Sequence, residues 1–372
     1  MVKNPMYGFC MIVLPVFTTV FFTSLMDEGQ PSDLPIAVVD LDNTSVSRQL
    51  TRTLDGFQST RIVARFNSIS HARKAMQQNK IYGFLYIPKG TTDKLLSYRQ
   101  PNISFFYGFT SLTAGSLVFK DLRTATLLAT AGVGAMTLSA KGLTSQQAMV
   151  LLQPITIDLH PLNNPWTNYN VYLSTMLIPG CIFLFVFLIT AYSIGTELKY
   201  GTGKEWIAMG KRNIYISLAG KLFPQTLVWW LIMFGYLFYI FQILHFPHPG
   251  GWLYITIMGI LSVLAAQGFG VFMFGLIPSL RMSMSLCCLW AVLSFSMVGT
   301  AFPVFAMDAP LEALANLFPL RHYFMIYSVS VFNSYPLANV WLNVLALCGF
   351  SVLPWFVAGR IRKNVCQGVY LP

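Results

Sequence analysis

Six long apolar runs without Asp, Glu, Lys or Arg alternate with polar stretches along the chain. Because a helix needs about 20 apolar residues to cross the hydrocarbon core of a bilayer, each run predicts a membrane-spanning helix. The runs are Tyr7–Leu25, Leu173–Ile194, Leu222–Leu244, Trp252–Ile277, Met284–Phe302 and Leu337–Ala358. A signal peptide is the alternative for the first run. Pro15 lies in its middle and no small-x-small cleavage site follows it, so we expect an uncleaved span.

The polar stretch between the first two runs has a different pattern, in which short apolar strands alternate with helices. Leu34–Val39 is apolar and β-branched, and Asp42-Asn43-Thr44 then provides capping residues for a helix at Ser45–Leu54. The alternation continues through Arg61–Phe66, Ser70–Gln78, Tyr82–Ile87, Thr91–Ser97, Asn102–Tyr107 and Ser111–Ala140, and then through a helix at Gln146–Gln153 and a strand at Ile155–Leu159. Alternating strands and helices predict a small α/β domain.

Together these patterns predict an α-helical polytopic membrane protein with six transmembrane helices and an inserted α/β domain. We expect the first transmembrane helix at 1–26, the α/β domain at 27–170 and a five-helix transmembrane domain at 171–372. The composition agrees, because 55% of the 372 residues are hydrophobic and only 10% are charged. That balance is too apolar for an ordinary soluble domain.

The basic residues predict the orientation of these helices. Ten Lys and Arg lie near the two termini, in the segment 195–221 and in the turn that holds Arg281, against only Glu197 and Glu205. The other short loops contain only Arg321 as a basic residue. By the positive-inside rule, both termini and the segment 195–221 are cytoplasmic and the α/β domain lies outside. The net charge of +11 is therefore a signal of topology, and no nucleic-acid partner is implied.

Two patterns that are typical of catalytic or metal sites fail when their spacing is checked. The run IAVVDLDNT is similar to the start of aspartyl-phosphate phosphatases, with Asp40 as the nucleophile, but no paired carboxylates follow to hold Mg²⁺. His245 and His248 are three residues apart, but Pro247 and Pro249 oppose the helix that would bring them together.

The run Tyr200-Gly201-Thr202-Gly203-Lys204-Glu205-Trp206 has the Gly-Lys pair of a phosphate-binding loop. In the pattern G-x-x-x-x-G-K-[ST], however, the first glycine would be Leu198 and the hydroxyl position would be Glu205. We therefore expect no nucleotide, no metal and no catalytic site in this chain.

The apolar runs also bear on the source of energy. Ion-driven carriers place ionisable side chains inside the bilayer, and the six runs contain no Asp, Glu, Lys or Arg. Energy for transport is thus expected from a partner. Trp206, Ile207 and Met209 alternate with charged residues, which is typical of a short helix that lies on the membrane face or docks on another protein. A solvated basic loop is the alternative.

Several motifs together resemble those of the permease subunits of ABC-2 type exporters with a large domain between the first and second transmembrane helices. The run IAVVDLDNTSVSRQLTRTLD matches at Asp40, Asp42, Asn43, Ser47, Arg48 and Leu50, and SISHARKAMQQNKIYGFLYIPKG matches at Ala72, Ile87 and Pro88. Further matches are Pro179 and Gly180 at the second span, Glu197, Gly201 and Thr202 in an E-x-E-x-G-T motif, and Gly220, Lys221 and Pro224 in a G-K-x-x-P motif. FPLRHYF resembles the family's segment that folds back into the outer leaflet before the last span. Lys199 departs from the family, since it replaces the second acid of E-x-E.

The resemblance implies a half-transporter that works as a homodimer or heterodimer on two separate ABC ATPase subunits. ATP and Mg²⁺ bind in those subunits, so this chain is expected to be no enzyme and to hold no cofactor. The implied protein is an exporter of a hydrophobic or amphipathic substrate, such as a drug or lipid, in the inner membrane of a bacterium. The sequence leaves open whether a periplasmic adaptor is a further partner. A receptor or scaffold whose outer domain binds a ligand without transport is the alternative.

The resemblance also implies two functional segments. In the coupling segment, residues 195–221, the expected ATPase-coupling residues are Glu197, Gly201, Thr202, Lys204, Glu205, Trp206, Lys211 and Arg212, with Trp206 as the anchor. In the gate segment, residues 303–336, an outer re-entrant gate is expected at Pro303, Pro319, Arg321 and His322.

Overall fold

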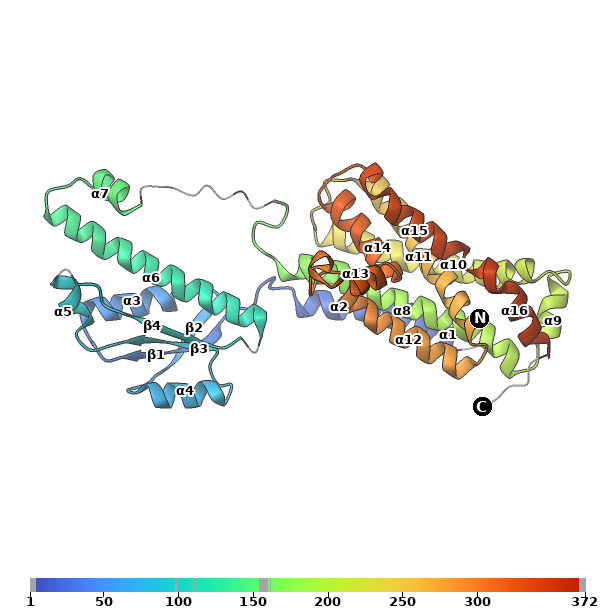
Figure 1. Ribbon diagram of the computed structural model, residues 1–372, viewed down its shortest axis with the longest axis horizontal. Coiled ribbons are helices and arrows are strands. Elements are labelled where there is room, and N and C mark those ends of the chain that lie inside the picture. Colours follow the sequence, from blue (N-terminus) through green and yellow to red (C-terminus); the bar gives the residue numbers. More distant parts are fainter. Residues whose placement is uncertain (1–4, 98, 110, 154–159, 161, 368–372) are drawn as a thin grey trace. The chain divides into compact units, whose positions relative to one another are not determined.

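The computed structural model describes residues 5–97, 99–109, 111–153, 160 and 162–367. The chain forms two compact units (Figure 1), an α/β unit of Gln30–His160 and a membrane unit of Met1–Gly29 with Pro161–Pro372. The strand predicted at Ile155–Leu159 lies outside the described residues.

The α/β unit is built on a four-stranded mixed sheet. Its strands are β1 (Leu34–Asp40), β2 (Thr60–Arg65), β3 (Gly83–Ile87) and β4 (Ser104–Tyr107). Their order is β2-β1-β3-β4, in which β1 runs parallel to both neighbours and β4 runs antiparallel to β3. The predicted α/β domain is thereby confirmed as a fold, with strand boundaries that shift by one or two residues.

Helices cover both faces of this sheet, as Figure 1 shows. The helices of the unit are α3 (Ser45–Asp55), α4 (Ile69–Gln77), α5 (Thr91–Leu96), α6 (Leu112–Ala140) and α7 (Ser145–Leu152). Successive residues of a strand point to opposite faces, so Ile36 and Val38 of β1 pack with α3 and α6. Ala37 and Val39 pack on the other face with α4.

The membrane unit contains six helices that are long and apolar enough to cross a membrane. These are α1-η1-α2 (Pro5–Gly8, Phe9–Val13, Leu14–Leu25), α8 (Tyr169–Lys199), α10-η2 (Ile214–Phe238, Tyr239–Ile243), α11 (Trp252–Leu276), α12 (Leu280–Met297) and η5-α15-α16 (Leu337–Val340, Trp341–Val352, Pro354–Gln367). The fifth helix ends at Met297, before the expected Phe302. Gly299 takes a left-handed conformation there (φ +102°), and Pro303 follows.

The long helix α8 lies at the centre of the membrane unit and packs against α2, α11 and α12. Small residues allow the close approach of its neighbours, as is usual in membrane helices. A Cβ atom on Gly180 of α8 would run into the ring of Phe295 on α12. A Cβ atom on Gly268 of α11 would run into the backbone of Phe350 on α15.

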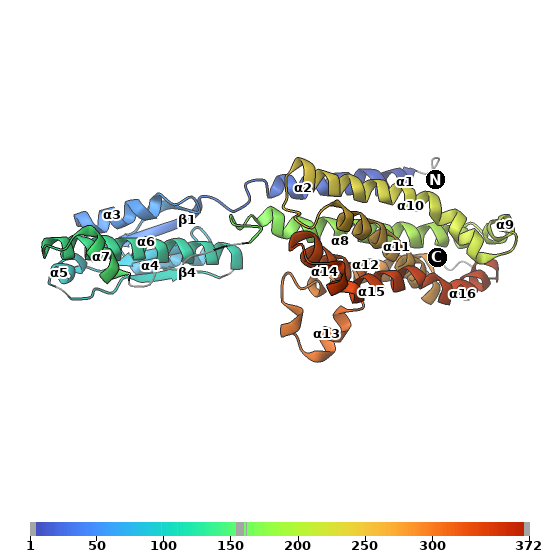
Figure 2. The same ribbon diagram turned by 90° about the horizontal axis from the view of Figure 1, so that it is seen from above.

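Short elements connect the long helices at two places. The helix α9 (Gly203–Met209) lies between α8 and α10. Between α12 and η5 lie η3 (Val304–Ala306), α13 (Ala309–Ala315), α14 (Pro319–Ile326) and η4 (Tyr327–Phe332). Figure 2 shows α13 standing off the bundle of long helices, whereas α14 packs against α11, α12 and α15.

Candidate coupling and gate sites

The helix α9 forms the middle of the coupling segment and packs against α8, α10 and α16 of the same chain. Thr202 precedes its first residue, and Glu205 in its first turn suits the positive end of the helix dipole. A Cβ atom on Gly203 would run into Val365, which shows that α9 lies directly on α16. Lys204 and Glu205 point to the exposed side of the helix.

An ion pair joins the coupling segment to two membrane helices. The Lys221 ammonium group on α10 pairs with the Glu197 carboxylate on α8, and Thr202 Oγ1 donates to the other oxygen of Glu197 at 2.5 Å. The ammonium group of Lys221 also lies 5.0 Å from the ring centroid of Trp206, within the range of a cation–π contact. Glu197 is thus the point where α8, α9 and α10 meet.

Trp206 holds α9 to the start of α10. It is only 5% exposed, its indole N–H donates to the Ser217 carbonyl oxygen at 3.2 Å, and Ser217 Oγ donates to the Trp206 carbonyl oxygen at 3.4 Å. The anchoring contacts of Trp206 in this structure are therefore made within the chain. The part that Lys221 and Ser217 play was missed by the sequence, because it appears only when α10 folds back beside α9.

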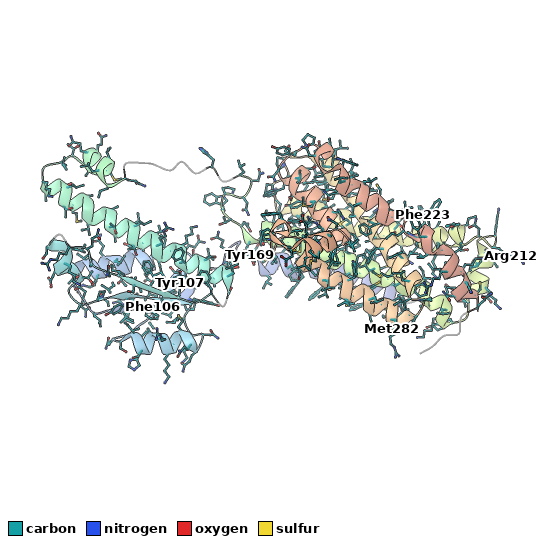
Figure 3. All side chains as sticks on the ribbon, viewed as in Figure 1. Phe106, Tyr107, Tyr169, Arg212, Phe223 and Met282 are labelled. Carbon is teal, nitrogen blue, oxygen red and sulfur yellow. The ribbon has the colours of Figure 1, made fainter. Side chains whose placement is uncertain are left out.

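Lys211 and Arg212 form the exposed tip of the coupling segment. Both take left-handed backbone conformations, with φ +53° and +60°, which cost residues with a side chain free energy. Figure 3 shows Arg212 at the end of the membrane unit, with its side chain directed away from the helices. Gly201 also has a positive φ of +70°, which accounts for a glycine at this position of the motif.

A pocket of about 420 Å³ opens between α9 and α10. It is lined by Glu197, Trp206, Met209, Gly210, Ile216, Ser217, Gly220 and Lys221. Met209 is 79% exposed at its edge. The pocket therefore combines an apolar rim with an ion pair at its wall.

The four expected gate residues lie on the segment between α12 and η5, and two of them make polar contacts inside the unit. Arg321 Nη1 donates weakly to the Val298 carbonyl oxygen at 3.5 Å, and its Nε is buried with no hydrogen-bond partner among the described residues. His322 is 5% exposed. Its Nε2–H donates to the Asn316 carbonyl oxygen and its Nδ1 lies beside Asn343 Oδ1, both at 2.8 Å.

The two expected gate prolines stand at the starts of short helices. Pro303 precedes η3 and Pro319 is the first residue of α14, a position where the missing N–H of proline costs nothing. The structure therefore places the four expected gate residues on one segment without bringing them to one point.

The end of η4 accepts hydrogen bonds from two distant segments, which the sequence did not predict. The last carbonyl groups of a helix lack partners within the helix, and here other segments supply them. Gly250 N–H donates to the Val331 carbonyl oxygen at 3.0 Å, and Asn163 Nδ2 donates to the Phe332 carbonyl oxygen at 2.8 Å. The loop before α11 and the stretch before α8 are thereby tied to the gate segment.

A pocket of about 630 Å³ adjoins the end of η4. Its lining is Leu162, Asn163, Pro249, Val329, Asn333, Ser334, Tyr335 and Asn339, an uncharged set with amide and hydroxyl groups. The two asparagines at 163 and 164 before an apolar run were a sequence signal for capping contacts, but their partners lie far along the chain.

The Asp40-Asp42 pair in the α/β unit serves as a cap. Asp42 accepts hydrogen bonds from Thr91 N, Thr92 N, Thr92 Oγ1 and Thr44 Oγ1 at 2.6–3.1 Å. Burial raises the pKa of Asp42, but the hydrogen bonds from Thr92 and Thr44 outweigh it, so the pKa lies below its ordinary value. Asp40 Oδ1 accepts from the backbone N–H groups of Asp42 and Asn43. Both carboxylates are thus engaged by the protein itself.

The described part of the chain contains no cluster of side chains that could hold a metal ion. Among those residues, no group of three His, Cys, Asp or Glu side chains is placed to hold an ion. His248 Nδ1 lies 2.9 Å from the Phe246 carbonyl oxygen, and its ring packs beside Phe241 and Trp252.

Comparison with known protein families gives a match over nearly the whole chain. The sequence model of a family described as ABC-2 family transporter protein matches residues 6–360 of the chain. No curated protein matches the chain.

Proposed function

The chain belongs to the ABC-2 transporter family and is a membrane permease without an ATPase domain, and from this premise we propose that it exports a hydrophobic or amphipathic substrate. Permeases of this family work with ABC ATPase subunits. ATP hydrolysis in two separate ATPase subunits drives the export, and a second permease, identical or paralogous, completes the transporter. The protein resides in the inner membrane of a bacterium, with both termini and the coupling segment in the cytoplasm.

The coupling segment is the docking place of the ATPase. Its tip exposes Lys211 and Arg212, two cations on a backbone that costs free energy to hold. The side chains of Lys204, Glu205 and Met209 are also exposed on α9. Such a mixed charged and apolar surface is typical of an interface that forms and reforms during a cycle.

Movement of the docked ATPase reaches the spans through Glu197, Trp206 and Lys221. Because the ion pair and the Trp206–Ser217 hydrogen bonds tie α9 to α8 and α10, a push on α9 moves both helices together. This network is the observation that carries the proposal, since it links an exposed docking helix to the central helix of the membrane unit.

The distribution of charge supports the substrate class. Within the spans, charged residues lie only toward the predicted cytoplasmic ends, at Glu197, Lys199, Lys221, Arg281, Arg360, Arg362 and Lys363. The remainder of each span is uncharged and mostly apolar, which suits a path for a hydrophobic or amphipathic molecule. The gate segment closes that path at the outer face. Pro319–Phe332 is too short to cross the membrane and is buried among the helices at Leu320, Tyr323 and Ile326, as irregular structure at membrane depth requires.

Purification of the full chain from native membranes tests the proposal. We expect an ABC ATPase to co-purify and its hydrolysis of ATP to change when the permease is bound. A periplasmic adaptor in the same complex would indicate a route across two membranes. Recovery of the chain with envelope proteins but without any ATPase would contradict the proposal and favour a receptor or scaffold.

A further inference from the structure

The helix α6 continues well past the core of the α/β unit. Its residues Ala114, Val118, Leu122 and Ala125 pack in the core on the same face of the sheet as α3. Beyond Ala129, which packs at the edge of that core, none of the described residues of α6 or α7 belongs to it. Figure 1 shows α6 extending past the strands, with α7 beside its far end.

The far end of α6 and α7 form a hairpin, here residues 126–152, whose two helices pack against each other. A Cβ atom on Gly134 would crowd the Leu152 side chain, and Ala148 is fully buried. These contacts hold the two helices together through small residues. They leave the large side chains of the hairpin uncovered.

Large apolar side chains cover the outside of this hairpin. Their exposed fractions are 59% for Leu127, 54% for Leu128, 68% for Met136, 57% for Met149, 66% for Val150 and 63% for Leu151. The exposed large apolar residues of α7, Met149, Val150 and Leu151, are consecutive and follow the exposed polar residues Gln146 and Gln147. Contiguous exposed apolar surface marks an interaction site.

The charge of the hairpin indicates the kind of partner. Between Arg123 and Asp158, Lys141 is the one charged residue in the sequence. The whole stretch 27–170 carries thirteen Lys and Arg against nine Asp and Glu. A charged partner would therefore find its electrostatic complement elsewhere on the domain. The hairpin suits a partner that is itself apolar and uncharged, and its own surface has those properties.

We propose that the hairpin binds the hairpin of a second copy of this chain around a two-fold axis. A two-fold interface requires one surface that is complementary to itself, and two domains of equal positive charge repel least where they carry no charge. The edge strand β2 is another place where copies could pair, but it exposes Arg61 and Arg65, which oppose pairing of identical edges. The inference rests on the proposed function in one respect, since it takes the permease to work as a pair.

Cysteine cross-linking of the full chain in membranes tests this interface. The sequence has no cysteine between residues 27 and 170, so Leu128→Cys, Met136→Cys and Leu151→Cys each add the first thiol to that stretch. Val63→Cys on β2 is the matched control, because Val63 is 53% exposed and Leu128 is 54% exposed. With a short bis-maleimide, we expect a species of twice the 41.7 kDa chain mass from the hairpin variants. Val63→Cys and the wild-type chain should give severalfold less of it.

A second variant tests whether cross-linking reflects a specific contact between two hairpins or chance collision of two chains in the membrane. Leu128→Glu/Met136→Glu/Leu151→Glu places like charges on both sides of the interface, and we expect it to lower cross-linking through Met149→Cys severalfold. These side chains are exposed, so the substitutions leave the core of the unit intact. Unchanged cross-linking in this variant would overturn the proposal.

Co-purification of the ATPase in the same samples keeps the two proposals apart. Absence of the dimer species at all three hairpin positions, with ATPase bound, would overturn the hairpin interface and leave the proposed function standing. The dimer species without any ATPase would support the interface and contradict the proposed function. Cross-links from the hairpin to a different protein would overturn the assignment of a second copy.

Discussion

The Glu197 carboxylate at the end of α8 and the Lys221 ammonium group on α10 form an ion pair across two membrane helices. Both side chains are largely buried, with 18% and 16% of their surfaces exposed. Trp206 of α9 stacks on the same ammonium group. One contact thus connects the docking helix, the central helix and the next span, and the proposed coupling depends on it.

Removal of either member of this ion pair should destabilise the membrane unit. We expect Lys221→Met and Glu197→Gln each to lower the free energy of unfolding by about 1–2 kcal/mol, because each leaves a poorly solvated charge or its partners unpaired. The double variant should lose less than the sum of the two single losses. Lys204→Met, at an exposed position of α9, is the control and should unfold like the wild type in a thermal melt. Equal stability of all four variants would show that the pair contributes nothing.

Charge reversal at the tip of the coupling segment should weaken binding of the ATPase. We expect Lys211→Glu/Arg212→Glu to accumulate in the membrane at wild-type levels but to bind the ATPase at least about tenfold more weakly, a loss of about 1.4 kcal/mol or more. Binding is measured by titration of the purified permease with the ATPase.

A control variant is needed that removes the charges of Lys211 and Arg212 but keeps the left-handed backbone of the tip. Lys211→Asn/Arg212→Asn removes the charges, while asparagine tolerates the left-handed conformations of these two positions. We expect an intermediate affinity from this variant. Wild-type affinity in the reversed variant would contradict the assignment of Lys211 and Arg212 to the ATPase contact.

The Asp42 cap should stabilise the α/β unit in a pH-dependent way. Loss of its hydrogen bonds in Asp42→Ala should cost about 1–2 kcal/mol of that unit's stability. Because the folded-state pKa of Asp42 lies below its ordinary value, the carboxylate contributes fully above about pH 4, and its contribution is lost as the pH falls through the folded-state value. Resistance of the α/β unit to proteolysis in the full chain, compared at pH 7 and pH 3.5, measures this.

Asn variants distinguish the cap from an enzyme nucleophile. Asp42→Asn should show a smaller loss on acidification than the wild type. Asp40→Asn keeps the Oδ1 that accepts two backbone N–H groups, so we expect it to retain stability and function. A Mg²⁺-dependent phosphatase activity that disappears in Asp40→Asn would contradict the structural role of this pair.

Asn163 should stiffen the end of the gate segment. Its side chain donates to the Phe332 carbonyl oxygen and its backbone is left-handed, with φ +59°. Asn163→Ala loses the hydrogen bond and adds backbone strain, while Asn163→Gly loses the hydrogen bond alone. We expect faster amide hydrogen exchange at Phe332–Tyr335 in both variants and a further loss of thermal stability, about 1 kcal/mol, in Asn163→Ala. Exchange rates equal to those of the wild type would show that the contact does not hold the gate.

The sequence predicted the parts of this protein that depend on local patterns. All six spans were found, because charge-free apolar runs of that length seldom form anything except a membrane-spanning helix, and the strands of the α/β unit followed from their alternation with capped helices. The end of α12 was placed at Phe302, since an apolar run does not reveal that Gly299 leaves the helix. Trp206 was expected to anchor the ATPase contact, which stays a prediction. Its hydrogen bond to Ser217 and the Glu197–Lys221 pair could not be predicted, because both require α10 to return beside α9. The Asn163–Phe332 contact spans 169 positions, and no local pattern encodes it.

ATP-dependent transport in a defined membrane tests the central claim most directly. The full chain and its co-purifying ATPase are reconstituted in liposomes, and a fluorescent amphiphile is followed across the bilayer with ATP and with a non-hydrolysable analogue. We expect movement with ATP and none with the analogue. We expect Lys211→Glu/Arg212→Glu to lose this movement, although the variant permease is still folded in the liposomes. Movement that is equal with ATP and with the analogue, or none with ATP while the bound ATPase hydrolyses it, would contradict the account.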